Sequence, residues 1–112
     1  GDLRKQTLAL VGPIAENNLK NFNIDKVFLG ANGITINEGF TTPDYTEANI
    51  KKVFIERSEK VIFVSDNSKF GKKSFVKISD IKTADVLITN NIDQELKSDF
   101  EKNDIKILVA NK

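Results

Sequence analysis

Polar side chains suited to binding a small anionic ligand gather in three short stretches of the sequence. The stretches cover residues 30–33, 39–51 and 66–71, and apolar runs precede them. Lysine ammonium groups supply point charges for a phosphate, and hydroxyl and backbone N–H groups can complete such a site. Carboxylates can accept hydrogen bonds from sugar hydroxyls. The candidate ligand-binding side chains are Asn32, Thr41, Thr42, Asp44, Glu47, Lys51, Asp66, Ser68 and Lys69.

The composition excludes several other kinds of chemistry. The 112 residues include no Cys, Met, Trp or His. Disulfides, a thiolate nucleophile, an imidazole base and a zinc site of the usual ligands are therefore excluded, and we expect no cofactor. The 17 basic and 16 acidic residues leave a net charge of +1, so no strong field favours nucleic acid or an anionic membrane. No apolar run approaches the roughly 20 residues that span a bilayer, and we expect a soluble domain.

The apolar pattern predicts which elements position the polar stretches. Short apolar runs predict strands at residues 7–11, 26–29, 61–64, 75–78, 86–89 and 105–109. Helical spacing predicts helices over residues 13–21, 47–58 and 93–103. Strands that alternate with helices imply right-handed βαβ units and a parallel sheet. Residues 1–112 are therefore predicted to form a single α/β domain with flanking helices.

Two of these elements carry more detailed expectations. Thr46 is the predicted N-cap of the helix over residues 47–58, whose inward stripe is Ile50, Val53 and Phe54. The run at 61–64 is expected to be buried on both faces of the sheet. Since the carboxyl ends of parallel strands share one edge, we expect all three polar stretches to converge on one ligand there.

Each candidate residue also has a purely structural alternative. The Thr-Pro-Asp sequence before the helix can serve only as a turn and cap, and Asp66 can cap the turn that follows it. Lys51 and Lys69 can be solvated surface charges. Asn32, between small residues, can be present because it tolerates a left-handed backbone. The repeated placement of polar stretches after strands favours the ligand-binding interpretation.

The order of these motifs resembles the sensor domain of DeoR-type bacterial transcription regulators. The resemblance rests on the segments Leu8–Pro13, Asp25–Ile34, Gly39–Asp44, Glu47-Ala48 with Lys51, and Asp66–Gly71, and on Val86–Thr89 followed by Asn90 where the family has an acid. It covers essentially the whole chain. The resemblance implies a parallel Rossmann-like sheet similar to that of ribose-5-phosphate isomerase.

By the same resemblance, the chain is the second half of a sensor that binds a phosphorylated sugar in a cytoplasmic repressor. The DNA-binding domain and the first half of the sensor are absent from these residues, and the abrupt start of the chain also suggests a fragment. Operator DNA would be bound only through the missing N-terminal domain, and we expect a homo-oligomer with no membrane partner. The implied effector-binding residues are Arg4, Asn32, Gly33, Thr42, Asp44, Glu47, Lys51, Asp66, Ser68 and Lys69.

Two other functions stay open at this point. A sugar-phosphate isomerase would use similar loops, but Asn32 replaces the loop acid and cannot act as a general base. Asp66 and Lys69 remain available for acid–base chemistry. The domain could also serve only for self-association. The resemblance favours a sensor that is not an enzyme.

Overall fold

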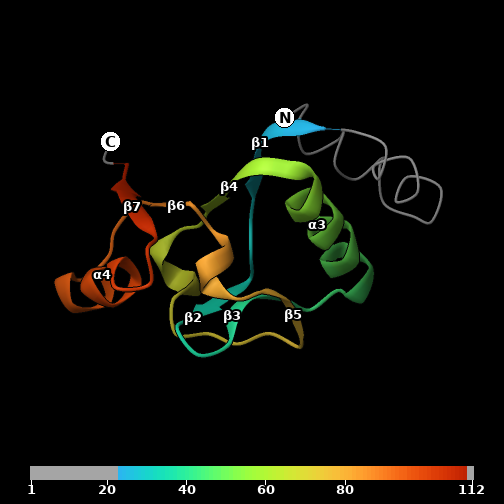
Figure 1. Ribbon diagram of the computed structural model, residues 1–112. Helices are drawn as coiled ribbons and strands as arrows, with labels where there is room; N and C mark the ends of the chain where they lie inside the picture. The colour runs from blue at the N-terminus through green and yellow to red at the C-terminus, as the bar shows by residue number, and fades with distance from the viewer. Residues whose placement is uncertain (1–22, 111–112) are drawn as a thin grey trace.

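The computed structural model describes residues 23–110, so the predicted strand at 7–11 and helix at 13–21 lie outside the described residues. The elements in chain order are β1 (Ile24–Leu29), β2 (Gly33–Thr35), β3 (Gly39–Thr42), α3 (Tyr45–Arg57), β4 (Ser58–Val64), the 3-10 turn η1 (Asn67–Lys69), β5 (Val76–Ser79), the 3-10 turn η2 (Ile81–Thr83), β6 (Val86–Thr89), α4 (Gln94–Glu101) and β7 (Lys106–Val109) (Figure 1). Within this part of the chain, no helix is long and apolar enough to cross a membrane.

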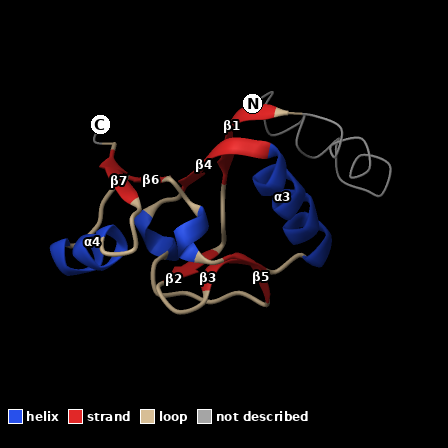
Figure 2. Cartoon of the chain, in the orientation of Figure 1, coloured by secondary structure: helices blue, strands red, loops and turns tan. Residues whose placement is uncertain are grey.

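The strands form two sheets rather than one. β1, β4, β6 and β7 form a parallel sheet in the order β1-β4-β6-β7, with Phe28 beside Ile62 and Ile62 beside Val86. This sheet and its helices confirm the predicted α/β fold. β2, β3 and β5 form a separate antiparallel sheet, which lies below the first in Figure 2. The predicted strand at 75–78 is therefore present as β5, but it does not belong to the parallel sheet.

One face of the parallel sheet lies against the main core. Val27, Val61 and Leu87 point to this face, where Ala48 of α3 and Phe100 of α4 belong to the same buried cluster. Burying such side chains stabilises each by about 1.5–3 kcal/mol relative to exposing it.

The opposite face of the sheet is less covered. Phe28 is 52% exposed, Val64 45% and Leu108 43%. The expectation that residues 61–64 are buried on both faces is therefore wrong at Val64. Both helices bury core residues on the other face of the sheet, so Val64 is left half open to solvent.

Aromatic contacts hold the smaller sheet against the larger one. The rings of Phe40 in β3 and Phe63 in β4 are stacked, with centroids 3.6 Å apart, and both side chains are fully buried. Phe70 contacts Phe100 of α4 with ring centroids 5.8 Å apart. A tilted pair such as Phe70 and Phe100 adds about 0.5–1.5 kcal/mol beyond the burial of its area. The two aromatic contacts fix the segments that follow the parallel strands.

The start of α3 differs from the prediction. Asp44 is the N-cap, and its carboxylate accepts hydrogen bonds from the backbone N–H groups of Thr46 (2.9 Å) and Glu47 (3.3 Å). Thr46 lies within the first turn, so the prediction of Thr46 as N-cap is wrong. A carboxylate is well placed there because it also meets the positive end of the helix dipole. The predicted inward residues Ile50 and Val53 are buried.

Candidate functional site

Two of the three polar stretches meet at the carboxyl ends of neighbouring parallel strands. We call residues 30–33, which follow β1, the β1 loop, and residues 66–71, which follow β4, the β4 loop. The backbone N–H of Gly71 donates to the carbonyl of Ile34 at 2.9 Å, and Ile34 forms a parallel bridge with Phe70. The β4 loop therefore runs beside the end of the β1 loop.

The third stretch, residues 39–51, is not a loop of the same sheet edge. It contains β3 of the antiparallel sheet and the first half of α3. The expected convergence of all three stretches is therefore wrong in its geometry, because β3 does not belong to the parallel sheet. Side chains and carbonyls of this stretch instead form hydrogen bonds that hold the β1 loop in place.

Residues of β3 and α3 fix the backbone of the β1 loop. Lys51 donates from Nζ to the carbonyl of Gly30 at 2.7 Å. The backbone N–H of Asn32 donates to the carbonyl of Thr41 at 2.8 Å, and the Thr41 hydroxyl donates to the carbonyl of Gly33 at 3.2 Å. A loop that is ordered before the ligand arrives loses less conformational entropy on binding.

Lys51 is a buried cation rather than a solvated one. The residue is 8% exposed, and Nζ also lies 2.7 Å from a carboxylate oxygen of Glu47, one helical turn earlier. The two residues meet at the i,i+4 spacing of a helix, and the alternative of a solvated Lys51 is wrong. Since two of its three donors are occupied by Gly30 and Glu47, Lys51 supports the loop backbone.

Asn32 projects from the β1 loop with its side chain held at one end. The Thr42 hydroxyl donates to Oδ1 of Asn32 at 3.2 Å, and Thr42 itself is completely buried. Asn32 is exposed. Asp104 is the one non-glycine residue with positive φ among residues 23–110, so the left-handed alternative for Asn32 is wrong.

Asp66 organises the β4 loop as the cap of η1. Its carboxylate accepts from the backbone N–H of Ser68 at 2.8 Å and from the Ser68 hydroxyl. These hydrogen bonds from Ser68, with smaller contributions from Lys69 and Lys72, hold the pKa of Asp66 below its usual value. The capping alternative for Asp66 is confirmed, and Ser68 is occupied in the same contact.

Lys69 is the cation of the β4 loop that stays available. It is half-buried, and its ammonium group makes no hydrogen bond or ion pair with any residue between 23 and 110.

Asn90, which follows β6, was not predicted as a site residue. Its Oδ1 accepts from the backbone N–H of Asn67 at 2.7 Å, so it anchors the β4 loop. The sequence indication was its position directly after a third apolar strand.

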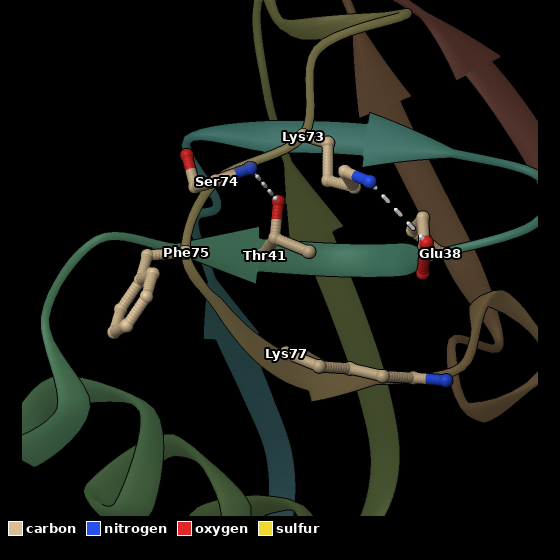
Figure 3. Close-up of a pocket in the computed structure, with 6 residues that line it drawn as sticks. All are labelled: Glu38, Thr41, Lys73, Ser74, Phe75 and Lys77. Carbon is tan, nitrogen blue, oxygen red and sulfur yellow. Dashed lines mark hydrogen bonds and ion pairs between the residues drawn. The ribbon is translucent and has the colours of Figure 1, made fainter.

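A separate cavity lies on the outer face of the antiparallel sheet. It has a volume of about 410 Å³. Figure 3 shows Lys73 pointing toward Glu38, 3.7 Å away, and Phe75 projecting away from the other side chains. The lining residues are Glu38, Thr41, Lys73, Ser74, Phe75 and Lys77. None of the residues implied by the resemblance lines this cavity, although Thr41 also supports the β1 loop.

The predicted site residues fall into two groups: some use their polar groups in contacts within the fold, and others leave them available to a ligand. Thr42, Asp44, Glu47 and Lys51 make contacts that hold the backbone or other side chains, and Arg4 lies outside the described residues. Asn32 and Lys69 have polar groups available at the sheet edge. No group of three or more carboxylates suited to a metal ion occurs between residues 23 and 110. The arrangement can offer hydrogen bonds and the positive charge of Lys69 to an anion.

Comparison with known proteins identifies the class of protein to which this fold and sheet-edge site belong. The model of the DeoR C terminal sensor domain matches residues 1–91. The HTH-type transcriptional regulator GlpR of Haloferax volcanii is 37% identical over 109 residues, which cover 96% of this chain and 43% of that protein. The putative aga operon transcriptional repressor of Escherichia coli O157:H7 is 36% identical over 90 residues, or 80% of this chain and 34% of that protein.

A third relative, the HTH-type transcriptional repressor GlcR of Bacillus subtilis, is 28% identical over 111 residues, or 98% of this chain and 43% of that protein. The chain belongs to the DeoR family of transcription regulators and carries its sensor domain. It spans less than half the length of these relatives.

Proposed function

We propose that this chain is the effector-binding part of a DeoR-type repressor of sugar-metabolism genes, and that its effector is a phosphorylated sugar. In the full-length protein, binding of the effector alters the affinity of a separate N-terminal domain for operator DNA. The effector lies at the carboxyl ends of β1 and β4. Asn32 and Lys69 contact it, and Lys69 binds the phosphate.

One observation carries the proposal. The β1 loop and the β4 loop lie side by side, joined by the hydrogen bond from Gly71 to Ile34, and each offers a polar side chain that the rest of the fold leaves available. In open α/β sheets, ligands bind beyond the carboxyl ends of the strands. An ammonium group on one loop and an exposed amide on its neighbour match the charge and hydrogen-bonding needs of a phosphate ester.

Substitution of Lys69 in the full-length protein tests this assignment. Because the phosphate is common to all candidate effectors, Lys69→Ala should weaken every sugar phosphate by a similar factor, about 10- to 100-fold. Lys69→Arg should restore part of the affinity by keeping the charge. Lys82→Ala removes an exposed lysine of η2 and is the matched control. Calorimetry that gives equal affinities for Lys69→Ala and the unsubstituted protein would place the phosphate elsewhere.

The sensor is proposed to have no enzymatic activity. The relatives are named as transcription regulators, and an amide at Asn32 cannot remove a proton as a carboxylate would. Asp66 already accepts two hydrogen bonds from Ser68, and its pKa is lowered, so it is a weak base. Turnover of any pentose or hexose phosphate in a coupled isomerase assay of the full-length protein would contradict this part of the proposal.

The proposal also concerns the whole repressor. DNA recognition is assigned to a domain outside these residues, the repressor is expected to act in the cytoplasm, and the sensor is expected to support homo-oligomers. The 112 residues alone should not retard a specific operator in an electrophoretic assay at physiological salt, whereas the full-length protein should. Specific retardation by the 112 residues would overturn the division of roles.

A further inference from the structure

The contact between Thr42 and Asn32 determines which end of the Asn32 amide faces outward. A threonine hydroxyl has one hydrogen to donate, and Thr42 donates it to Oδ1 of Asn32 at 3.2 Å. Thr42 is completely buried at the end of β3, so its hydroxyl is shielded from competition by solvent. The carbonyl end of the amide is therefore held inward, and the NH₂ end is directed away from Thr42.

The backbone around Asn32 leaves the side chain little freedom to reverse this orientation. The backbone N–H of Asn32 donates a hydrogen bond to the carbonyl of Thr41. The next residue, Gly33, is packed so closely that a Cβ added there would lie 2.4 Å from the carbonyl oxygen of Lys72. The loop that carries Asn32 is thus fixed on both sides of the residue, and the amide presents two N–H donors at the sheet edge.

We propose that Asn32 reads the effector as a hydrogen-bond donor, contacting an acceptor oxygen in the phosphate or in the sugar, and that Thr42 is the residue that positions it. The inference rests on the proposed function and assigns the polarity of one contact in that site. A carboxylate at position 32 would accept the Thr42 hydrogen bond equally well. It would then offer only acceptors to the ligand, which reverses the polarity of the contact.

Because Asn32→Asp reverses the polarity of the ligand contact, it tests that contact without removing the hydrogen bond from Thr42. Asn32→Asp keeps the bond from Thr42 and adds a negative charge at the edge of the site. Thr42→Val keeps the shape of the buried side chain and removes the donor that orients the amide. Thr42→Ser keeps that donor. Thr46→Val is the matched control, since Thr46 is exposed and no hydrogen bond of its side chain occurs among residues 23–110.

The measurement is isothermal titration of the full-length repressor with ribose 5-phosphate, glucose 6-phosphate, fructose 1-phosphate and glycerol 3-phosphate, followed by the variants against the tightest of these. Asn32→Asp should weaken binding by about 100-fold, because a donor is lost and the added charge repels the phosphate. Thr42→Val should weaken it by about 10-fold, and Thr42→Ser by less than about 3-fold. Thr46→Val should leave it unchanged, and thermal melts should show that Asn32→Asp is folded.

Competition with inorganic phosphate shows whether the acceptor oxygen that Asn32 contacts belongs to the phosphate or to the sugar. If the acceptor is a phosphate oxygen, Asn32→Ser weakens inorganic phosphate and the sugar phosphate by the same factor. If it belongs to the sugar, only the sugar phosphate is weakened. Equal or tighter binding by Asn32→Asp, or unchanged binding by Thr42→Val, overturns the inference while the proposed function stands. Failure of the unsubstituted repressor to bind any of the four compounds overturns the proposed function and the inference with it.

Discussion

The β1 loop and the β4 loop end neighbouring strands at one sheet edge, but different parts of the chain hold them. The β1 loop is fixed from outside, by Lys51 of α3 and by Thr41 and Thr42 of β3. The β4 loop is held partly from within, by the contacts between Asp66 and Ser68, and partly by Asn90 and the Ile34 carbonyl. The first loop thus has its geometry set by the core, and the second carries the available charge on a local turn. A site built this way combines a hydrogen-bonding partner held by the core with a cation carried on a short 3-10 turn.

The largest difference between the loops should appear when a methyl group is added to a glycine of each. In Gly33→Ala the new Cβ would lie 2.4 Å from the Lys72 carbonyl oxygen and 2.8 Å from the Thr41 hydroxyl. The backbone must move, at a cost of about 3 kcal/mol or more in the free energy of unfolding. Gly71→Ala meets nothing within 4 Å, but φ is +81° there. It should cost about 1–2 kcal/mol.

Urea denaturation of the protein measures both changes. A larger destabilisation by Gly71→Ala than by Gly33→Ala would contradict the difference between the two loops. That result would mean that the β4 loop is packed as tightly as the β1 loop.

The buried cation of α3 should give the next largest effect. Lys51→Met removes the donor to the Gly30 carbonyl and leaves that oxygen without this partner. We expect a loss of about 1–3 kcal/mol in the free energy of unfolding. Lys52→Met changes an exposed lysine at the next position and should alter it by less than about 0.5 kcal/mol. Equal losses for the two variants would show that α3 does not hold the β1 loop.

The sequence predicted those parts of the fold that depend on local pattern. Apolar runs located β1, β4 and β6, because buried parallel strands need continuous apolar side chains. Helical spacing located α3, and within that helix Glu47 and Lys51 meet because residues four apart lie on one face. The family resemblance implied the Rossmann-like form of the sheet.

The parts that the sequence did not predict depend on contacts between distant residues. The direction of β5 and its separate sheet follow from pairing Thr42 with Val76, which no local pattern specifies. The burial of Lys51 depends on its reach to Gly30, 21 positions earlier in the chain. Capping by Asp44 rather than Thr46 was a choice between two good caps, decided by where the helix begins.

The smallest expected effect is a pH-dependent opening of the β4 loop. Since the pKa of Asp66 is lowered in the folded protein, its contribution is complete above the ordinary value of about 3.9 and is lost as the pH falls through the lower folded value. Hydrogen exchange below about pH 4 should become faster at the Ser68 amide relative to the Asn32 amide. Asp66→Asn should remove this dependence. Equal acceleration at both amides would mean that the two loops open together.

The order of the strands has a consequence for how the protein is made. The sheet grows in one direction, β1-β4-β6-β7, which is also the order in which a ribosome releases these strands. Each emerging strand can pair with one already in place, and no described strand must be inserted between two partners of the parallel sheet. Domains fold from the N-terminus during synthesis at about 5–20 residues per second. Both loops precede β7 in the chain, so the sheet-edge site can be assembled before β7 emerges.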